Sequence, residues 1–457
     1  IDFAHYYAGP IAAMLLADQG ANVIRIVRPG EKELPESQYR LLNRNKKLLT
    51  LDLKTEEGRN QALLLIEKAD VLIENFRPGV MKRLGLDYAS VKNNNPGLVY
   101  LSLPGFASTD KARAPIQAWE GILSAATGVY TETGLVRQKL GFPPLYSGLP
   151  VCSTQGAMHG AVAVMTGLLA RKQQGGGTVI EVPLADAGLG MFSLYFGDYF
   201  RKGVDDPKEE LPQALRPFGY SPTDDQSTQI KKLRQGRSSI YESLSYFRDW
   251  TCGDGRKMYI WGLGDQTLLI FLKQIGIYEK LLCEGFVFVS SCDWVSELDN
   301  NVNDFVGLSA ERKARLTQLI SEALLTKTAE EWESILQLAG LAAGVARTRE
   351  EWLALKPMLD SGVNTEVHDD DVTWTVPGRA VDMSGPEEQL IDGFQEAEGI
   401  SFTQADKLFA DRNAEEYSVE SIVQTKGGLL DGLKVLDLTN LLAGPTSTYV
   451  LAQYGAD

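Results

Sequence analysis

Apolar stretches and amphipathic segments alternate along the first two hundred residues of the chain. Runs of apolar residues predict strands at 23–27, 48–53, 70–74, 98–103 and 178–182. The segments between them predict helices at 12–17, from 55, at 153–171 and from 183. Thr55 has the side chain of a helix N-cap, and Gly175 begins a glycine run that ends the long helix. Strands that alternate with helices predict an α/β fold with a doubly wound, mostly parallel sheet whose ligands bind at the carboxyl ends of the strands.

A second, smaller domain is expected, because a chain of 457 residues exceeds the size of one hydrophobic core. Residues 252–255 have the composition of a turn and lie between predicted strands at 241–247 and 257–261, which favours a hairpin. The predicted division is a large domain over 1–200, a linker over 201–241, an inserted smaller α+β domain over 242–339, a return to the large domain over 340–385, an acidic linker over 386–432 and a further unit from 433.

The opening motif of the chain occurs a second time near its end. With an offset of 435 residues, eight residues of the first copy recur in the second: Asp2, Ala8, Gly9, Pro10, Leu16, Ala17, Gly20 and Ala21. Each copy has the pattern of a strand end, a loop, a helix that proline begins and a glycine that ends it. The offset is too long for a solenoid repeat. We therefore expect a tandem duplication, of which residues 1–432 are one unit and 433–457 the truncated start of another.

Charge is distributed unevenly along the chain, whose net charge is -15. Residues 360–432 contain 17 acidic and 4 basic residues, while seven basic residues stand against three acidic ones between 25 and 48. A basic segment that follows a strand–helix–strand unit is able to receive a phosphorylated ligand. A solvated loop has the same composition, and charge alone favours that interpretation.

Composition narrows the class of protein. Four cysteines without paired metal-ligand spacing indicate reduced thiols in a cytoplasmic enzyme, with no metal site. No run approaches the ~18 apolar residues of a membrane span, and we expect neither membrane nor nucleic acid as a partner. The short motifs of P-loop, dinucleotide-binding, zinc-protease and serine-hydrolase sites are absent from the sequence.

An ordered series of motifs resembles the class III CoA-transferases, a family that includes the formyl-CoA:oxalate and carnitine CoA-transferases. The motifs lie at 2–27, 43–47, 50–54, 69–71, 74–81, 95–100, 175–182 and 186–187, with a weaker likeness as far as Val345. The fused build is similar to that of CoA-transferase/lyases that act on dimethylsulfoniopropionate. The resemblance implies a Rossmann-like large domain interrupted by a small one, two units interlocked as a pair, and coenzyme A as the substrate that carries the acyl group.

Residues that match the family's ligand positions follow from the same resemblance. Tyr7 and Ala8 fall at the loop that lines the CoA cleft, and Arg28 falls near the adenosine phosphates. Contacts to adenine and pantetheine are implied for Asn75, Phe76 and Arg83. A guanidinium group binds phosphate oxygens through paired hydrogen bonds, which agrees with the arginines in this set.

The sequence departs from the family at the catalytic position. The family's nucleophile is an aspartate four residues before a glycine at the start of the long helix, and here Cys152 stands four residues before Gly156. Glu120 matches a glutamate that assists this nucleophile, but Gln117 and Trp119 replace the commoner Lys and Tyr. No glycine-run lid precedes Trp261. A thiolate at a helix N-terminus can exchange thioesters, yet it cannot form the family's carboxylic anhydride.

These observations predict a class III CoA-transferase that moves CoA between a short acyl-CoA and a small carboxylate. This unit is then the N-terminal, non-nucleophilic half of a fused enzyme, and its partner is a second unit of the same chain or a homodimer mate. One alternative is a non-catalytic half that binds CoA or only completes its partner's fold. Another is an enzyme similar to the 2-methylacyl-CoA racemases, which need a His/Asp acid–base pair; Cys152 and the absence of a nearby histidine in sequence argue against it.

Overall fold

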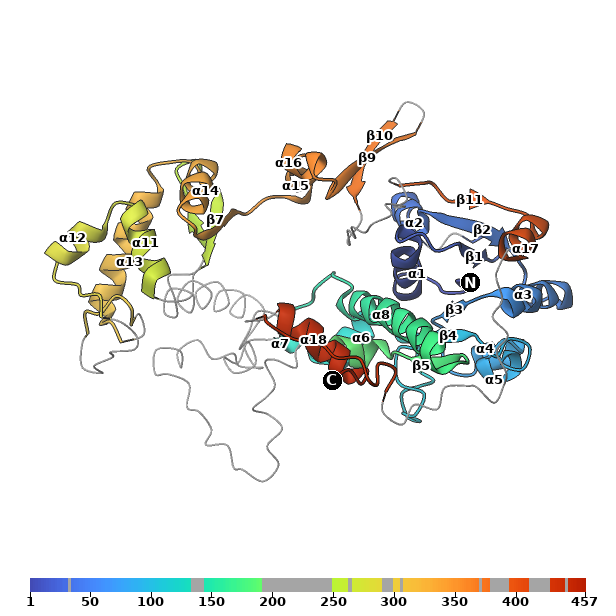
Figure 1. Cartoon of the computed structure of the whole chain (residues 1–457). Coiled ribbons are helices and arrows are strands. Elements are labelled where there is room, and N and C mark those ends of the chain that lie inside the picture. Colours follow the sequence, from blue (N-terminus) through green and yellow to red (C-terminus); the bar gives the residue numbers. More distant parts are fainter. Residues whose placement is uncertain are drawn as a thin grey trace, which may run out of the picture. The chain divides into compact units, whose positions relative to one another are not determined.

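The computed structural model describes residues 1–31, 34–132, 144–190, 249–261, 265–289, 299–304, 307–369, 372–378, 394–410, 428–439 and 443–457. The chain divides into two compact units, drawn in Figure 1. The first unit is Ile1–Thr133, Leu145–Val204 and Lys356–Asp457, and the second is Gly134–Pro144 and Asp205–Leu355. The predicted linker over 201–241 lies outside the described residues.

A parallel sheet forms the centre of the first unit. Its strands are β1 (Val23–Val27), β2 (Lys46–Thr50), β3 (Val71–Glu74), β4 (Val99–Ser102), β5 (Thr178–Glu181) and β11 (Glu398–Gly399). They occur in the order β11, β2, β1 and then β3, β4, β5, and the backbone of Asp2 bridges β1 and β3 in parallel. Every pairing within this sheet is parallel. The predicted α/β class and parallel sheet are therefore confirmed.

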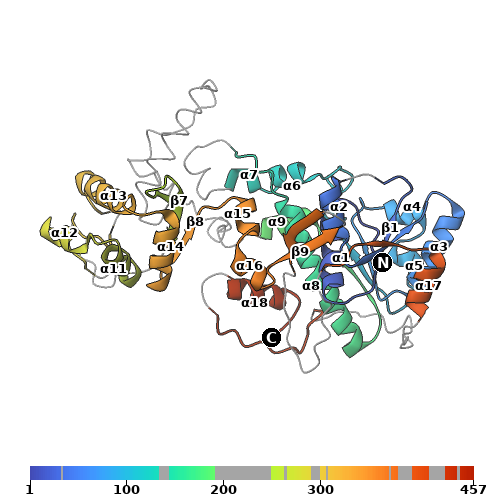
Figure 2. The ribbon, with the colours of Figure 1, turned by 90° about the horizontal axis from the view of Figure 1, so that it is seen from above.

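Helices lie on both faces of this sheet, as Figure 1 and Figure 2 show. Alternate strand residues belong to two separate apolar cores: Ile73 and Leu101 to one, Leu72 and Tyr100 to the other. One face carries α1 (Ala8–Asp18), α6 (Glu120–Ala126), α7 (Val129–Glu132), α8 (Val151–Gln174) and α9 (Leu184–Gly190). The other core includes residues of α3 (Glu56–Lys68), α4 (Val80–Leu84), α5 (Tyr88–Val91) and α17 (Phe402–Ala410). The remaining elements of this unit are α2 (Glu36–Asn43), α16 (Lys356–Asp360), β9 (Asn364–Asp369), β10 (Val372–Pro377) and α18 (Ala443–Gln453).

Local sequence signals set several of these helix ends. Thr55 precedes α3, and its hydroxyl accepts a hydrogen bond from the Gly58 amide at 3.0 Å, as an N-cap does. Gly175 ends α8 with a backbone φ of +77°, a conformation that favours glycine. Both features were predicted, because a cap and a glycine stop act over only a few residues.

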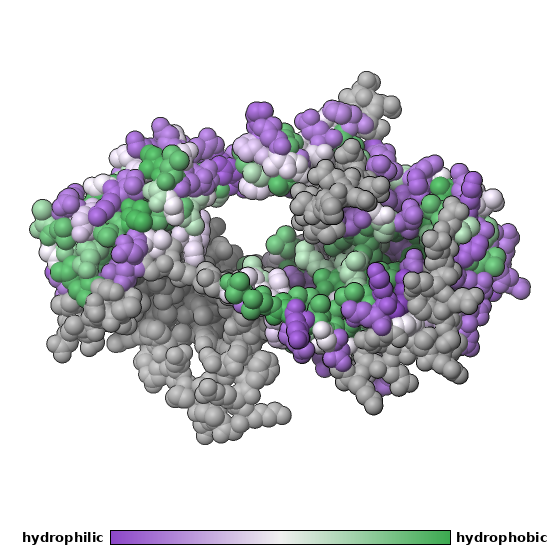
Figure 3. All heavy atoms as spheres, viewed as in Figure 1, coloured by the Kyte–Doolittle hydropathy of each residue, from purple (hydrophilic) through white to green (hydrophobic). Residues whose placement is uncertain are grey.

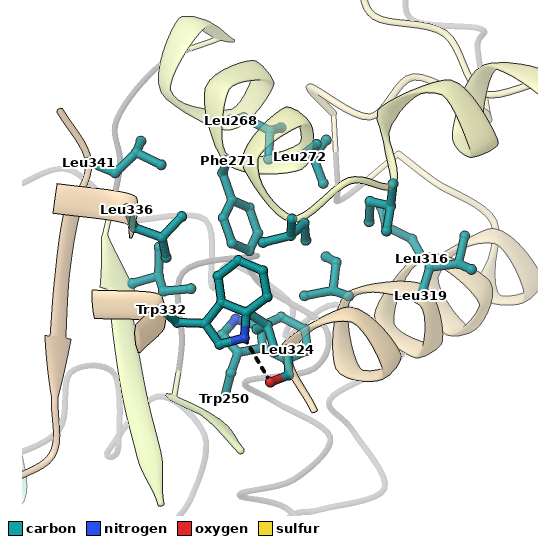
Figure 4. Close-up of a cluster of buried hydrophobic side chains, with 14 of the residues drawn as sticks. Trp250, Leu268, Phe271, Leu272, Leu316, Leu319, Leu324, Trp332, Leu336 and Leu341 are labelled. Atoms are coloured by element: carbon teal, nitrogen blue, oxygen red, sulfur yellow. Dashed lines mark hydrogen bonds between the residues drawn. The ribbon is translucent and has the colours of Figure 1, made fainter. Parts of the chain in front are cut away.

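The second unit has its own sheet and core. β6 (Asp249–Thr251), β7 (Lys257–Trp261) and β8 (Ala342–Val345) form an antiparallel sheet. Among the described residues, its core includes side chains of α11 (Asp265–Gln274), α12 (Tyr278–Cys283), α13 (Ala310–Leu324) and α14 (Ala329–Leu338), and the short helix α15 (Arg349–Leu353) follows β8. Figure 4 shows the core, where the Trp332 indole donates a 2.9 Å hydrogen bond to the Leu324 carbonyl. The hairpin at 249–261 agrees with the prediction, whereas the predicted strand at 241–247 lies outside the described residues.

Two predicted boundaries differ from the structure. The chain does not return to the large unit at 340: β8 pairs with β7, and the second unit continues to Leu355. Part of the predicted acidic linker, 394–410, belongs to the large unit instead. There β11 extends the sheet beside β2, and α17 packs on α3 through the buried Ala405. Acidic side chains of this segment pair with basic ones of the large unit, as Arg40–Glu396, Lys47–Glu398 and Lys68–Asp406.

Helix α8 is buried on one face only. Cys152, Ala157, Ala163, Val164 and Ala170 are buried. Met158, Val162, Met165 and Leu169 are exposed and repeat at spacings of four, three and four, so they form one apolar stripe along the helix. Apolar side chains gather over α8 and α18 on the face seen in Figure 3.

Candidate active site

The N-terminus of α8 is capped by a side chain from another helix. Its own N-cap residue is Pro150, which makes no side-chain cap hydrogen bond. Glu120, the first residue of α6, supplies the cap instead: its carboxylate accepts 2.9 Å hydrogen bonds from the amides of Cys152 and Ser153. A carboxylate is favourable here because the first amides of a helix lack internal partners and carry partial positive charge. The structure therefore brings Glu120 and Cys152 together.

The Cys152 thiol is enclosed by neutral and acidic groups. Its side chain is buried, and its Sγ lies 3.9 Å from the Ser124 Oγ and 3.8 Å from the Thr127 Oγ1. Helix α9 closes the site from another side, since a Cβ at Gly188 would lie 2.4 Å from this sulfur. Burial, together with the nearby Glu120 carboxylate, raises the pKa of the Cys152 thiol. Near neutral pH the group is a thiol, which is a poor nucleophile.

Ser124 and Thr127 were not predicted as site residues. The Ser124 hydroxyl donates a 2.9 Å hydrogen bond to Glu120, so this residue links the carboxylate to the surroundings of the thiol. Glu120, Ser124 and Thr127 are spaced four and three residues apart, which places them on one face of a helix. This spacing was visible in the sequence, but only the fold shows that the face meets Cys152.

Two loops of the predicted CoA cleft are joined through Asn75. The Asn75 amide group accepts a 2.8 Å hydrogen bond from the His5 backbone amide and donates a 2.7 Å hydrogen bond to the His5 carbonyl. The rings of His5 and Phe76 are in edge contact, with centroids 5.1 Å apart. These loops follow the strand segment at Asp2 and strand β3, so they lie at the carboxyl edge of the parallel sheet, where ligands of such folds bind.

The other predicted CoA residues lie near the same strand ends. Tyr7 is the N-cap of α1, and its hydroxyl donates a 3.0 Å hydrogen bond to the Gln38 side chain; Ala8 is the buried first residue of that helix. Arg28 is exposed immediately after β1. Arg83 is exposed in α4, the helix that follows the β3 loop. The Arg28 backbone amide donates a 3.4 Å hydrogen bond to the Glu31 side chain, which also pairs with Arg25.

The basic residues of the motif at 43–47 build the fold. The Lys46 ammonium is buried and donates to the Asp2 carboxylate at 2.9 Å and to the Pro10 carbonyl at 2.8 Å. Arg44 is buried as well and pairs with Asp18 at the end of α1. These contacts fasten α1 to the sheet, so this part of the basic segment is not available to a phosphate.

Metal-binding clusters and membrane-spanning helices are both absent from the described part of the chain. No group of three or more His, Cys, Asp or Glu side chains there is arranged to hold a metal ion. Within the same residues, no helix combines the length and apolar character that crossing a membrane requires.

Comparison with known proteins gives the family. The sequence pattern of CoA-transferase family III matches residues 1–237, 251–392 and 430–457. The chain is 34% identical over 466 residues to CoA-transferase/lyase DddD of Marinomonas sp., covering 100% of this chain and 54% of that protein. It is 26% identical over 388 residues to a formyl-CoA:oxalate CoA-transferase of Afipia carboxidovorans, covering 80% of this chain and 82% of that protein.

Solved structures agree at the level of the fold. A CAIB/BAIF family protein from Brucella suis has a TM-score of 0.64 to this chain at 20% identity, over 90% of this chain and 96% of that one. The protein Rv3272 of Mycobacterium tuberculosis, in its orthorhombic crystal form, has a TM-score of 0.61 at 22% identity, over 87% of this chain and 94% of that one. The chain spans about half the length of its DddD relative. By its sequence match over most of its length, the chain belongs to CoA-transferase family III.

Proposed function

We propose that this chain is the non-nucleophilic, CoA-binding half of an enzyme that moves CoA between a short acyl-CoA and a small carboxylate. Its relatives include a CoA-transferase/lyase and formyl-CoA:oxalate CoA-transferases, which supports transfer chemistry of this class. Coenzyme A enters as part of the substrate, and no metal is required.

One observation carries the assignment of a non-nucleophilic role. The position of the family's aspartate holds a buried thiol, and the helix amides beside it already bind the Glu120 carboxylate. A nucleophile needs an exposed, ionised group and free donors for the oxyanion that forms. Here the thiol keeps its proton and the Glu120 carboxylate occupies the amides of Cys152 and Ser153 that would otherwise be free, so the site is suited to structure rather than acyl transfer.

The two joined loops at the carboxyl ends of the strands support the proposed CoA binding. Asn75 and Phe76 lie on a loop that hydrogen-bonds to the His5 loop, and Tyr7 and Ala8 begin helix α1 directly after that loop. Arg28 is exposed directly after β1. We assign Arg28 to the phosphates of the nucleotide and Arg83 to the adenine end. The bidentate donors of arginine suit phosphate oxygens better than a lysine would.

The same proposal includes a Rossmann-like large domain interlocked with a second CoA-transferase unit. Support comes from the exposed stripe of α8, since contiguous apolar surface of this kind marks protein interfaces. The repeated opening motif at 436–457 supports a second unit within the same protein, and a partner copy of this unit is the other possibility. A cytoplasmic location fits a CoA-dependent enzyme with reduced thiols.

A scaffold that binds no CoA is the main alternative. It would explain the buried thiol equally well, so CoA binding by the wild-type chain decides between the two proposals. The racemase-like alternative requires an aspartate paired with a histidine, and Cys152 occupies the position of that aspartate.

Calorimetric titration of the chain with CoA and with dephospho-CoA tests the proposal. We expect CoA to bind, and Arg28→Ala to weaken CoA about tenfold while weakening dephospho-CoA less, because the lost contact is to a phosphate group. Lys172→Ala is the control: this exposed lysine lies in the last turn of α8, before the amino end of β5, and its loss should change neither affinity. Absence of CoA binding by the wild-type chain would refute the proposal and favour the scaffold.

A further inference from the structure

Two consecutive residues at the end of strand β3 bind loop backbone through their side chains: Glu74, the last residue of the strand, and Asn75, the next residue. The buried Glu74 carboxylate accepts a 2.8 Å hydrogen bond from the Phe76 amide, two residues further on. Asn75 reaches the other way and makes its paired hydrogen bonds to the His5 backbone at 2.8 and 2.7 Å. Glu74 and Asn75 thus each hold one of the two loops proposed to line the CoA cleft.

The loop held by Asn75 has a backbone that needs support. Tyr6 has a φ of +60°, a conformation that residues with side chains rarely adopt and that recurs at functional sites. The Tyr6 ring meets the Trp119 ring edge-on, with centroids 4.6 Å apart. Trp119 is the N-cap of α6, directly before Glu120, so this contact connects the loop to the cap of α8.

We propose that Glu74 and Asn75 are positioning residues that hold the His5–Tyr6 loop and the Phe76 turn together as a single preorganised wall of the CoA cleft. Neither residue touches the ligand in this account. Both polar atoms of the Asn75 side chain bond the His5 backbone. Asn75 therefore has a role different from the CoA contact that the family resemblance implies. The inference rests on the proposed CoA binding, but its structural part can be tested without ligand.

The pair of Glu74 and Asn75, with their hydrogen bonds to the two loops, is called the clamp below. Titration of Glu74 gives this clamp a measurable pH dependence. Burial raises the pKa of Glu74 from its ordinary value of 4.5 to about 7, although hydrogen bonds from Ser102 and the Phe76 amide act in the opposite direction. The neighbouring groups are Ser102 and Tyr100 on β4 and Glu181 on β5, whose charge adds to the rise. Between pH 4.5 and 7 the closed turn keeps a proton that the solvated, open turn has lost. Opening of the turn therefore becomes easier as pH rises through this window, by up to about tenfold per pH unit, and levels off above pH 7.

Amide hydrogen exchange of the ligand-free chain, corrected for intrinsic rates, tests the clamp. Exchange at Phe76 should become faster from pH 5 to 7 in the wild type and stay flat with pH in Glu74→Gln, which keeps an acceptor but cannot ionise.

Asn75→Ala should speed exchange of the His5 amide tenfold or more, because that amide loses its acceptor. Asn75→Asp keeps an acceptor for the His5 amide but places a charged oxygen where the donor faced the His5 carbonyl. It should still protect the His5 amide better than alanine does, and it serves if the alanine variant does not fold. The control is Asn94→Ala, because the Asn94 side chain donates its hydrogen bond to the exposed Glu67 of α3.

Calorimetry on the same variants tests the effect on the cleft. If the clamp positions the cleft, Asn75→Ala lowers CoA affinity about tenfold and Asn94→Ala does not. Unchanged exchange at His5 in Asn75→Ala, or the same pH dependence at Phe76 in Glu74→Gln as in the wild type, would overturn the clamp. Altered exchange with unchanged CoA affinity would overturn its positioning role. A wild-type chain that binds no CoA would refute the proposed function, while the exchange measurements would still decide whether the clamp exists.

Discussion

The two copies of the opening motif have the same local geometry. Helix α1 covers Ala8–Asp18, and α18 covers Ala443–Gln453, the same eleven positions displaced by 435. Gly20 has a φ of +95° and Gly455 a φ of +94°. In the first copy the amide of Asp2 donates to the carbonyl of Ile24, and in the second the amide of Val435 donates to the carbonyl of Asp457. Both pairs are separated by 22 residues, so the register of the unit is the same.

The surroundings of the two copies differ. Ile1 and Phe3 are 7% and 2% exposed, because they lie between β1 and β3, while their counterparts Leu436 and Leu438 are 82% and 84% exposed. Leucine side chains this exposed forgo most of the ~1.5–3 kcal/mol that burial of each would contribute. The first copy is part of a sheet, whereas residues 436–439 and 443–457 show the turn and the helix with no sheet around them in the part of the chain that the structure describes.

The aspartates of the two copies show the same contrast in polar contacts. Both accept a hydrogen bond from the amide two residues on, at 2.9 Å for Asp2 and 2.8 Å for Asp437. Asp2 also holds the buried Lys46 ammonium, whereas Asp437 is exposed and accepts a 2.6 Å hydrogen bond from the Thr448 hydroxyl. Short-range hydrogen bonds therefore form the motif, while burial and ion pairing come from the rest of the unit.

The largest expected effect is removal of the cation from the first copy. Lys46→Met leaves the Asp2 carboxylate buried without its partner, which should lower the free energy of unfolding by about 3–5 kcal/mol. Thr448→Val removes the hydrogen bond from the Thr448 hydroxyl to the exposed Asp437. This substitution should change the free energy of unfolding by less than ~0.5 kcal/mol. Urea unfolding of both variants measures the difference. Equal losses would mean that the two copies have equivalent surroundings.

A smaller difference in stability loss between the two copies is expected at Gly9 and Gly444, the second residue of each helix, which faces the segment before the helix. A Cβ on Gly9 would lie 2.0 Å from the Cβ of buried Ala4, so Gly9→Ala should cost about 1–3 kcal/mol through overpacking. A Cβ on Gly444 would lie 2.2 Å from the Cβ of exposed Thr439, which can move toward solvent. We expect Gly444→Ala to cost less than ~1 kcal/mol in the same urea assay. A larger loss for Gly444→Ala than for Gly9→Ala would contradict the assigned difference in packing.

The smallest difference is expected at the glycines that end the two helices. Gly20→Ala and Gly455→Ala each place a side chain at a φ near +95°, at a cost of roughly 1–2 kcal/mol in either copy. Amide exchange at Ala21 and Ala456 reports each turn locally, because these amides donate to Leu16 and Leu451 at 3.1 and 3.2 Å. Similar acceleration of amide exchange in both turns would support the view that residues within each turn determine its conformation. An effect confined to one copy would show that distant contacts shape the turn.

This division between local and distant causes also explains what the sequence could predict. The positions of the strand segments, the Thr55 cap and the Gly175 stop could be predicted because each depends on residues within a short stretch of the chain. The parallel class of the sheet followed from the alternation of strands and helices. The pairing of 398–399 with β2 could not be predicted, because Glu396 and Glu398 pair with basic residues more than 300 positions earlier. The acidic composition of 386–432 predicted a linker instead.

The candidate site follows the same rule. Family resemblance implied that Glu120 lies near Cys152, but the hydrogen bonds of its carboxylate to the Cys152 and Ser153 amides became visible only in the fold. The exposed stripe of α8 was missed because composition reports how apolar a helix is, not which elements cover it. The CoA contacts of Arg28 and Arg83 remain predictions.

Mass analysis of the chain after incubation with an acyl-CoA is the sharpest test of the non-nucleophilic role. A buried thiol beside an occupied helix N-terminus should carry neither an acyl group nor a CoA adduct, so the peptide that contains Cys152 should keep its unmodified mass at neutral pH. Cys283, which is exposed, provides an internal control for nonspecific acylation. An adduct on Cys152 or Glu120 that exceeds labelling of Cys283 would contradict the non-nucleophilic assignment and make this unit a site of the reaction.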